Sequence, residues 1–321
     1  MTHSKNLIYN IVFLDRKTLG DDIGLEQFDK FGNITMYEST KPDETLKRVQ
    51  NNSIIVTNKV VIDKEVIDNS DIKLICVAAT GMNNIDLEYA KQKNIVVKNV
   101  AGYSTTSVAQ LTFAFALQFI QKINYYDNYV KSGGWENSDI FTNLDKPFYE
   151  LEGKTWGIIG LGNIGKSVAK IAGAFGCNIQ YYSTSGTNNN ATHSKQTLEQ
   201  ILKTSDIISI HSPLNKDTLN LINKNNIQNI KDGAILLNLG RGGIVNEQDI
   251  SDAINSDADI FYGTDVVVKE PIEKTSPLLT IRDKERVLFS PHIAWASKEA
   301  RVRLLNGIED NIKEFVLQYK L

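Results

Sequence analysis

An arginine, a glutamate and a histidine in the second half of the chain could together bind a carboxylate and transfer a proton. They are Arg241, Glu270 and His292, and each follows a short apolar run. An arginine binds a carboxylate through two parallel hydrogen bonds. A histidine donates a proton near neutral pH, and a neighbouring carboxylate raises the pKa of an imidazole. We therefore expect Arg241 to hold a carboxylate, His292 to donate a proton and Glu270 to orient His292.

Each of these residues also has a purely structural interpretation. Arg241 stands among glycines and could be a surface arginine, and Glu270 could be a solvated loop residue. His292 could be a turn histidine whose ring is bonded to the backbone. All three, however, follow the carboxyl ends of predicted strands, and open α/β sheets bind their ligands at that edge. Their joint occurrence there favours the catalytic interpretation.

A glycine-rich loop precedes the three residues. Gly160, Gly162 and Gly165 lie between an apolar run and a segment with helical spacing. In such a loop the first glycine permits a tight turn, the second lets the backbone approach a pyrophosphate, and the third lets the helix pack closely on the strand. A structural turn is the alternative, but this context favours dinucleotide binding, and hydride transfer to a 2-keto acid requires such a cofactor. The predicted phosphate loop comprises Gly160, Leu161, Gly162, Asn163, Ile164 and Gly165.

The segment after the glycine loop lacks the acidic residue that normally binds the ribose of NAD. The predicted strand 178–182 leads into Ser183 and Thr184, and residues 153–198 contain no Asp, Glu or Arg. The hydroxyls of Ser183 and Thr184 can hydrogen-bond either a ribose or a 2′-phosphate. We expect NAD as the cofactor, because Lys195 is the only lysine in the following segment. NADP stays open as an alternative, because no carboxylate is present to repel its phosphate.

The composition is that of an ordinary globular protein. Of the 321 residues, 41% are hydrophobic and 23% are charged, and the net charge is −3. The Lys and Arg residues are scattered, so we predict no binding surface for nucleic acid or an anionic membrane. The two cysteines form neither a disulfide framework nor a metal-binding pattern, which favours a reducing compartment and no bound metal.

The hydropathy of the chain favours a cytoplasmic location. The apolar run 7–14 is short, contains Asn and lacks a small-residue cleavage site, so we interpret it as a first strand rather than a signal peptide. No apolar run approaches the roughly 18 residues needed to span a bilayer. We therefore expect a cytoplasmic protein.

Short β-rich apolar runs alternate with helix-like segments along the whole chain. Such alternation is typical of βαβ units with parallel sheets, and two series of runs predict two α/β domains. The first series is 7–14, 33–38, 53–57, 73–78 and 95–98. The second series is 155–160, 178–182, 206–210, 234–238, 260–264 and 286–289.

Two long helices are expected outside these series. The segment 104–123 is apolar nearly all round, so we expect it to be buried between domains or between two subunits of a homodimer. The segment 297–318 is apolar on one face, and we expect it to pack back on the first domain. The segments 131–150 and 185–196 are predicted to be loops, because turn-forming or polar residues dominate them.

Seven segments carry a likeness to one enzyme family. They are 79–86, 102–110, 160–165, 211–214, 238–243, 265–271 and 290–295. Through them the chain resembles the D-isomer-specific 2-hydroxyacid dehydrogenase family over essentially its whole length. Within that family it is most similar to the glycerate dehydrogenases, also called hydroxypyruvate reductases. This closer likeness lies in residues 57–59, 102–105 and 291–297.

The resemblance implies a fold and a reaction. The fold is a Rossmann NAD(P)-binding domain at 101–293 with a flavodoxin-like substrate domain formed by 1–100 and 294–321, both built on parallel sheets, in a homodimer. The reaction is the reversible reduction of a small 2-keto acid, such as hydroxypyruvate or glyoxylate, to the D-2-hydroxy acid with NAD(P)H. Its partner is thus a small molecule.

The resemblance also implies a role for individual residues. Arg241 binds the substrate carboxylate and keto oxygen, His292 protonates that oxygen, and Glu270 orients His292. Asp265 holds the nicotinamide carboxamide. Besides the phosphate loop, the implied cofactor-binding residues are Ser107, Ser183, Thr184, Pro213, Leu239, Gly240, Arg241, Asp265 and His292. The implied substrate-binding residues are Asn58, Thr80, Gly81, Met82, Arg241 and Trp295.

Two alternatives keep the fold and change the function. One is another dehydrogenase of the family, acting on pyruvate, 2-ketoisocaproate, formate or phosphite. The other is a dinucleotide-sensing corepressor that binds protein peptides. Trp295 beside His292 favours a small 2-keto acid, and no added interaction arm is recognisable in the sequence.

Overall fold

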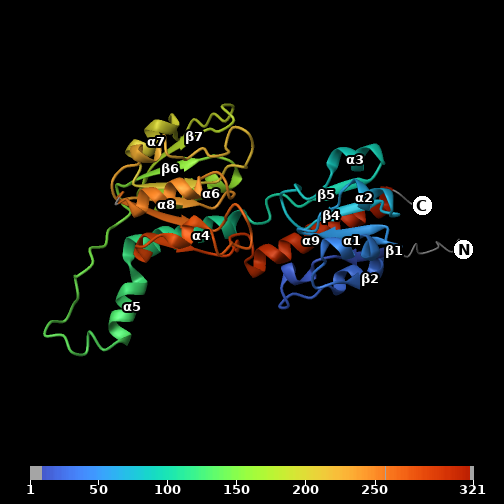
Figure 1. Ribbon diagram of the computed structural model, residues 1–321, viewed down its shortest axis with the longest axis horizontal. Helices are drawn as coiled ribbons and strands as arrows, with labels where there is room; N and C mark the ends of the chain where they lie inside the picture. Colours follow the sequence, from blue (N-terminus) through green and yellow to red (C-terminus); the bar gives the residue numbers. More distant parts are fainter. Residues whose placement is uncertain (1–8, 257, 319–321) are drawn as a thin grey trace, which may run out of the picture. The chain divides into compact units, whose positions relative to one another are not determined.

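The computed structural model describes residues 9–256 and 258–318, which form two compact units (Figure 1). Unit 1 consists of Met1–Ser104 with Ala296–Leu321, and unit 2 consists of Thr105–Trp295. Of the predicted first strand, residues 7 and 8 lie outside the described part of the chain. Both units are α/β structures, and every strand pair in them is parallel, as the alternating pattern of the sequence predicts.

Unit 1 is built on a five-stranded sheet with the strand order β2-β1-β3-β4-β5. This order is that of the flavodoxin-like fold. The strands are β1 (Tyr9–Phe13), β2 (Gly32–Met36), β3 (Ile54–Thr57), β4 (Leu74–Val77) and β5 (Val96–Asn99). The helices are α1 (Pro42–Val49), α2 (Lys64–Asp68), α3 (Leu87–Gln92) and α9 (Lys298–Gln318), with the 3-10 turns η1 (Arg16–Leu19) and η2 (Glu26–Phe31).

The last helix, α9, packs on the sheet of unit 1. It contacts β4 and β5, and its apolar face is buried there. A Cβ atom at Gly307 would lie 2.5 Å from a methyl group of Val100, so the helix approaches the end of the sheet closely at this glycine. Lys98 and Glu314 form an ion pair of 2.5 Å between β5 and α9. The carboxyl-terminal segment is thus part of the same unit as the first hundred residues.

Unit 2 is built on a seven-stranded sheet with the order β12-β11-β10-β9-β6-β7-β8. From β8 to β11 this is the order of the Rossmann fold, which reverses direction between β6 and β9. The strands are β6 (Thr155–Ile159), β7 (Asn178–Tyr182), β8 (Ser194–Lys195), β9 (Ile207–Ile210), β10 (Ala234–Asn238), β11 (Ile260–Thr264) and β12 (Val287–Phe289). The helices are α4 (Thr105–Gln121), α5 (Ile123–Lys131), α6 (Asn163–Ala174), α7 (Leu198–Thr204) and α8 (Glu247–Asn255), with the 3-10 turns η3 (Ile227–Asn229), η4 (Pro277–Thr280) and η5 (Lys284–Arg286).

The short strand β8 corrects one prediction. The sequence pattern predicts a loop throughout 185–196, but Ser194 and Lys195 pair with Gln180 and Tyr181 at the edge of the sheet. Both residues of β8 are exposed, so backbone pairing rather than burial forms this strand. Its polar side chains carry no strand signal, and the sequence pattern could not reveal it.

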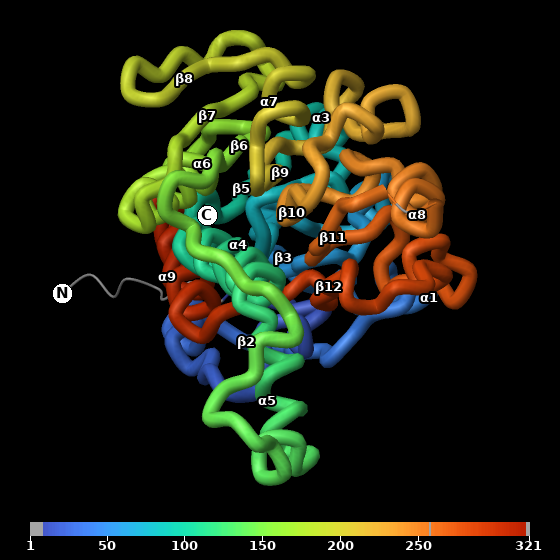
Figure 2. Tube along the Cα trace, turned by 90° about the vertical axis from the view of Figure 1, so that its left-hand side faces the viewer, coloured from blue at the N-terminus to red at the C-terminus, as the bar shows by residue number. Residues whose placement is uncertain are grey.

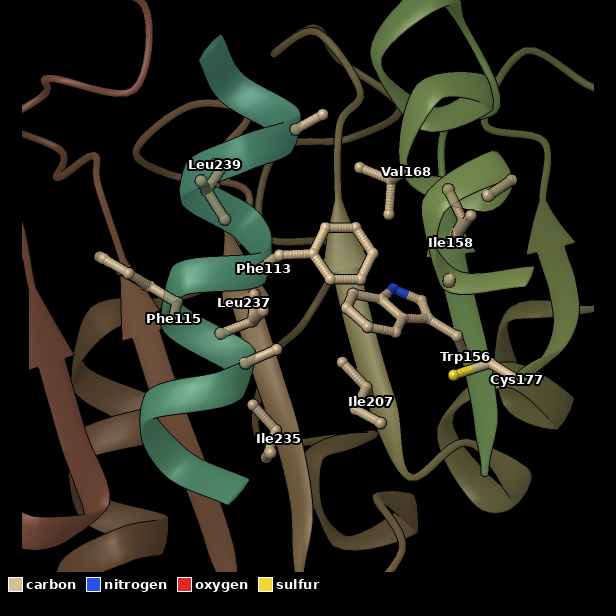
Figure 3. Packing of buried hydrophobic residues seen from close by; sticks show 14 of the residues in the cluster. Phe113, Phe115, Trp156, Ile158, Val168, Cys177, Ile207, Ile235, Leu237 and Leu239 are labelled. Carbon is tan, nitrogen blue, oxygen red and sulfur yellow. The ribbon is translucent and has the colours of Figure 1, made fainter. Parts of the chain in front are cut away.

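The helix α4 supplies much of the core of unit 2. It contacts β10 and α6, and Phe113 points from it toward Trp156 of β6, with the ring centroids 4.7 Å apart (Figure 3). Burial is not complete on every side, however, because Thr106, Gln110 and Ala114 form an exposed stripe. Burial of this stripe between two subunits, as expected for a homodimer, stays a prediction.

A second helix and a long loop follow α4. The expected helix 104–123 ends at Gln121, because Lys122 adopts a left-handed conformation with a φ of 50°. The chain then forms α5, which the sequence analysis did not separate. Residues 132–154 contain no helix or strand. In both views α5 and this segment project from the rest of unit 2 (Figures 1 and 2).

Candidate active site

The site is centred on a hydrogen bond between Glu270 and His292. Glu270 Oε2 lies 2.7 Å from His292 Nδ1, and the two side chains are about one third and one fifth exposed. Glu270 stands in the turn after β11, and His292 in the turn after β12, the neighbouring strand. Because parallel strands end at the same edge, the two turns meet there. The pair leaves the second ring nitrogen, Nε2, as the atom that could donate a proton.

A buried carboxylate fixes the turn that carries His292. Asp265 Oδ1 accepts hydrogen bonds from Ser290 Oγ at 2.5 Å and from the Ile293 backbone N–H at 2.8 Å, and Oδ2 accepts one from the Ala294 N–H at 2.9 Å. The His292 N–H donates to the Asp265 carbonyl at 2.8 Å. Burial raises the pKa of the Asp265 carboxyl, and these hydrogen bonds oppose the rise. The carboxylate thus positions His292, in addition to the cofactor contact that the family resemblance implies for it.

Arg241 follows β10, the next strand of the same sheet. Its Nη1 donates to the Gly240 carbonyl at 2.8 Å, and Asn238 Nδ2 donates to the Arg241 carbonyl at 3.0 Å, which fixes the loop at both ends. No carboxylate within residues 9–256 and 258–318 forms an ion pair with Arg241. A half-buried guanidinium in this state can bind a carboxylate that comes from outside the chain.

The glycine loop joins β6 to α6 at the same edge of the sheet. Gly160 has a φ of 93°, and a Cβ atom there would lie 2.9 Å from the Ser212 backbone nitrogen. A Cβ atom at Gly165 would lie 2.3 Å from the Gly160 carbonyl oxygen. Both glycines are therefore required by the fold of the chain itself.

Gly162 differs from these two glycines. It has a negative φ of −79°, and a Cβ atom there would meet nothing within 4 Å. It is the N-cap of α6, and no side chain caps the helix. Open space above an uncapped helix N-terminus fits the approach of a pyrophosphate. Its oxygens would accept hydrogen bonds from the free N–H groups and lie at the positive end of the helix dipole. The residues present thus fit a dinucleotide.

The loop after β7 lies against the glycine loop. Ser183 is buried, and its Oγ accepts a hydrogen bond from the Asn188 N–H at 3.2 Å. Asn188 Nδ2 donates to the Leu161 carbonyl at 2.5 Å. Lys195 Nζ lies 3.0 Å from the Gly186 carbonyl oxygen, to which it donates. The structure therefore places Ser183 and the half-buried Thr184 beside the glycine loop, together with Asn188, which the sequence analysis missed because amides carry no signature of cofactor binding.

The other predicted cofactor residues lie in unit 2. Ser107 Oγ donates to the Ala294 carbonyl at 2.5 Å, which ties the start of α4 to the His292 turn. Leu239 is buried directly after β10. Pro213 follows β9, after His211, and neither ring nitrogen of His211 has a hydrogen-bond partner within the part of the chain that the structure describes. Burial lowers the pKa of His211 to about 3. This imidazole is therefore neutral at physiological pH.

The predicted substrate residues are divided between the units. Arg241 and Trp295 belong to unit 2, whereas Asn58 follows β3 and residues 80–82 follow β4 in unit 1. The Asn58 N–H donates to Asp15 Oδ1 at 2.9 Å, and Thr80 Oγ1 donates to the Val100 carbonyl at 3.3 Å. Asp15, a buried residue that the sequence analysis did not single out, thus fixes the loop that carries Asn58.

In residues 9–256 and 258–318 no helix has the length and apolarity that crossing a bilayer requires. Within the same residues no group of three or more His, Cys, Asp or Glu side chains is arranged to hold a metal ion.

The two parallel sheets and the glycine loop define a dinucleotide-binding α/β protein. Residues 113–294 match the family model of the D-isomer specific 2-hydroxyacid dehydrogenase NAD-binding domain, which is more than half of the chain. The chain belongs to the D-isomer specific 2-hydroxyacid dehydrogenase family. The match confirms the family that the sequence motifs predict.

Individual relatives agree with this assignment. The chain is 36% identical over 315 residues to a hydroxypyruvate reductase of Blautia hydrogenotrophica, covering 95% of this chain and 96% of the relative. An acyclic imino acid reductase in complex with NADPH and D-arginine superposes with a TM-score of 0.83 at 26% identity, covering 96% of this chain and 97% of the other. The D-lactate dehydrogenase of Aquifex aeolicus, complexed with NAD and lactic acid, gives a TM-score of 0.81 at 25% identity, with 96% of both chains covered.

Proposed function

We propose that this chain reduces a small 2-keto acid to the D-2-hydroxy acid with NAD(P)H, reversibly. The observation that carries the proposal is the 2.7 Å contact between Glu270 and His292, in the same unit as the glycine loop. A hydroxypyruvate reductase among the relatives supports a substrate of the size of hydroxypyruvate or glyoxylate. Trp295, three residues after His292, is a large side chain that favours a small 2-keto acid.

Each residue of the site has one task in this reaction. Arg241 binds the substrate carboxylate in two-pronged fashion and so fixes the keto carbon. A reduced nicotinamide cofactor held at the glycine loop would supply a hydride to that carbon. His292 transfers the proton from Nε2 to the keto oxygen, and the hydride and the proton together convert the carbonyl into an alcohol. Glu270 holds Nδ1, which orients the ring and leaves Nε2 as the proton donor.

Two domains share these tasks. Residues 101–293 form the NAD(P)-binding domain, and residues 1–100 with 294–321 form the substrate domain. The family model at 113–294 and the uncapped N-terminus of α6 support the first assignment. The substrate loops that hold Asn58 and residues 80–82, at the carboxyl ends of β3 and β4, support the second, because ligands of open parallel sheets bind at that edge.

A substrate panel tests the proposed function. The purified protein is incubated with NADH or NADPH and with hydroxypyruvate, glyoxylate, pyruvate or 2-ketoisocaproate, and cofactor oxidation is followed by absorbance. Formate and phosphite are tested with the oxidised cofactors. We expect the highest kcat/KM with hydroxypyruvate or glyoxylate and a product of D configuration. Turnover of formate or phosphite alone would contradict the proposal, and so would cofactor binding without any turnover, which is the behaviour of a corepressor.

We further propose that NAD is the preferred cofactor and that discrimination against NADP is weak. No carboxylate follows β7, so nothing in this loop repels a 2′-phosphate. The hydroxyl groups of Ser183 and Thr184 suit a ribose, and Lys195 is already bonded to the Gly186 carbonyl and to Asn189 Oδ1 at 2.9 Å.

A homodimer is the assembly that we propose. The segment formed by α5 and residues 132–149 exposes large apolar side chains in the single chain, and a patch of this kind marks an interface. They are Ile123, Val130, Trp135, Ile140, Phe141, Leu144, Phe148 and Tyr149. Phe141 is 88% exposed and Leu144 is 71% exposed, values that are costly for a solvated monomer. A twofold symmetric partner would cover the same patch on both copies.

A cytoplasmic location is the last part of the proposal. Cys76 and Cys177 are both free and buried, and burial raises the pKa of Cys76 to about 12. Unpaired thiols that are kept in the core fit a reducing compartment. Fractionation of cells that produce the protein, with activity measured in each fraction, checks the location.

A further inference from the structure

A carboxylate outside the Arg–Glu–His set touches the turn that carries Glu270. Glu247 is the first residue of α8, and its Oε1 accepts a hydrogen bond from the Val268 backbone N–H at 2.6 Å. The side chain is half-buried at this contact. Burial raises the pKa of the Glu247 carboxyl, and the hydrogen bond from Val268 opposes the rise. A backbone N–H that would otherwise lack a partner is thus satisfied from another element.

The peptide between Val267 and Val268 also lies against the loop that carries Arg241. A Cβ atom at Gly242 would lie 2.0 Å from the Val267 carbonyl oxygen and 2.6 Å from the Val268 nitrogen, so the two backbones touch. The peptide between Val267 and Val268 is therefore fixed on one side by the loop of Arg241 and on the other by the Glu247 carboxylate.

This peptide is directly connected to the catalytic carboxylate. The Val267 N–H donates to Glu270 Oε1 at 3.3 Å, and Glu270 Oε2 is the atom that contacts His292 Nδ1. Glu270 stands on an exposed turn, in which Val268 is 66% exposed, so packing alone does not fix its side chain. The bond from Val268 to Glu247 is a direct anchor of this turn to a helix.

We propose that Glu247 is a positioning residue, which holds the 266–270 turn so that the Glu270 carboxylate meets the His292 ring. The inference rests on the proposed function for its kinetic consequences. Glu247 acts through the turn that carries Glu270 rather than on the reacting atoms. The contact requires an acceptor oxygen but no negative charge, because its donor is a neutral backbone N–H.

Two substitutions distinguish the acceptor from the charge. Glu247→Ala removes the acceptor, and we expect kcat for keto-acid reduction to fall roughly three- to tenfold, the effect of one lost partly buried hydrogen bond. We also expect the alkaline limb of the pH profile of kcat to move to lower pH in this variant, because a displaced Glu270 holds the protonated His292 ring less well. Glu247→Gln keeps the acceptor oxygen, so we expect kcat and the alkaline limb of its pH profile to stay as in the wild type. Gln248→Ala is the matched control, because Gln248 is exposed on the same helix and contacts Asp252 instead. Equal losses in Glu247→Ala and Glu247→Gln would overturn the proposal.

A titration by NMR tests the same inference without turnover. The chain has four histidines, so the imidazole signals of His292 can be assigned with a His292→Asn variant. Within the described part of unit 2, His292 faces two carboxylates, Glu270 and Asp265. We expect the midpoint of the His292 titration to move down in Glu247→Ala and to stay in place in Glu247→Gln.

A double substitution decides whether Glu247 acts through Glu270. In a Glu270→Gln background, Glu247→Ala should cause no further shift of the His292 midpoint, because coupled residues are not additive. A further shift of the same size would overturn the proposal. If the wild-type chain reduces no keto acid, the proposed function fails. The His292 titrations of Glu247→Ala, of Glu247→Gln and of the double variant still report on the role of Glu247.

Discussion

His292 is held in a backbone conformation that few residues adopt. Its φ is 54°, in the left-handed region. The Asp265 carboxylate accepts hydrogen bonds from the backbone N–H groups of Ile293 and Ala294, which follow His292. Such conformations cost free energy and persist where the surroundings impose them, often at functional sites. Here the consequence is geometric, since the ring is directed at Glu270 and its second nitrogen is left for a substrate.

Removal of the imidazole tests the proton donor at this scale. His292→Ala should lower kcat by a factor of order 10² to 10⁴, the usual contribution of a general acid. His292→Asn serves as a second variant, because asparagine tolerates a positive φ and keeps the turn. Reduced-cofactor binding, followed by fluorescence, should change little in either variant. Wild-type turnover in both would exclude His292 as the donor.

The ribose end of the site allows an equally local test. Ser183→Asp should raise the preference for NADH over NADPH by about tenfold or more, which corresponds to about 1.4 kcal/mol of differential binding. An aspartate can still accept the hydrogen bond that the Asn188 N–H donates to Ser183, so the loop should persist. Ser185→Asp, at an exposed neighbouring position, is the control. A wild type that already rejects NADPH by several orders of magnitude would contradict this account of Ser183.

At the scale of elements, the strands other than β8 could be predicted from the sequence. Apolar β-rich runs alternate with amphipathic segments, and a parallel sheet buried on both faces produces this pattern. The strand β8 could not be predicted, because Ser194 and Lys195 are polar and owe their conformation to pairing with β7. The break between α4 and α5 was also missed, since nothing in the composition around Lys122 marks a left-handed residue.

The same distinction applies to the site. Arg241, Glu270 and His292 could be found because their chemistry is specific and their positions follow strands. Glu247 and Asn188 could not, because each acts through backbone atoms of a distant segment, and such contacts leave no trace in residue spacing. Asp15 belongs to the same group.

The turn after β9 should make the stability of the protein sensitive to acid. Folded His211 stays neutral down to about pH 3, because burial lowers its pKa to about 3, whereas an unfolded histidine takes up a proton below its ordinary value of 6.5. The unfolded state therefore binds more protons between these values, and the free energy of unfolding falls as the pH is lowered through this window. This contribution is fully present above pH 6.5.

Replacement of His211 measures this contribution. His211→Gln cannot titrate, so its urea midpoint should fall less than that of the wild type between neutral pH and about pH 4.5. His193→Gln, in the loop after β7, is the control. Equal acid sensitivity of His211→Gln and the wild type would show that His211 is not the responsible group.

At the scale of the whole molecule, the exposed apolar segment predicts the assembly. Sedimentation at micromolar concentration should give about twice the 35.9 kDa mass of the chain. Phe141→Glu combined with Leu144→Glu should shift the equilibrium to the monomer, because two charges would have to be buried in an apolar contact. A monomeric wild type, or a double variant as dimeric as the wild type, would contradict the proposed interface.

The most direct test of the whole account is the pH profile of keto-acid reduction in Glu270→Gln beside that of the wild type. The amide keeps the shape of the side chain and removes the negative charge that favours the protonated His292 ring. Because that ring is the proton donor, the account predicts that the alkaline limb moves to lower pH. Glu273→Gln, which alters a carboxylate paired with Lys269 a few residues away, should leave the limb in place. An alkaline limb that does not move in Glu270→Gln would show that Glu270 does not support His292, and the Arg–Glu–His site would have to be abandoned.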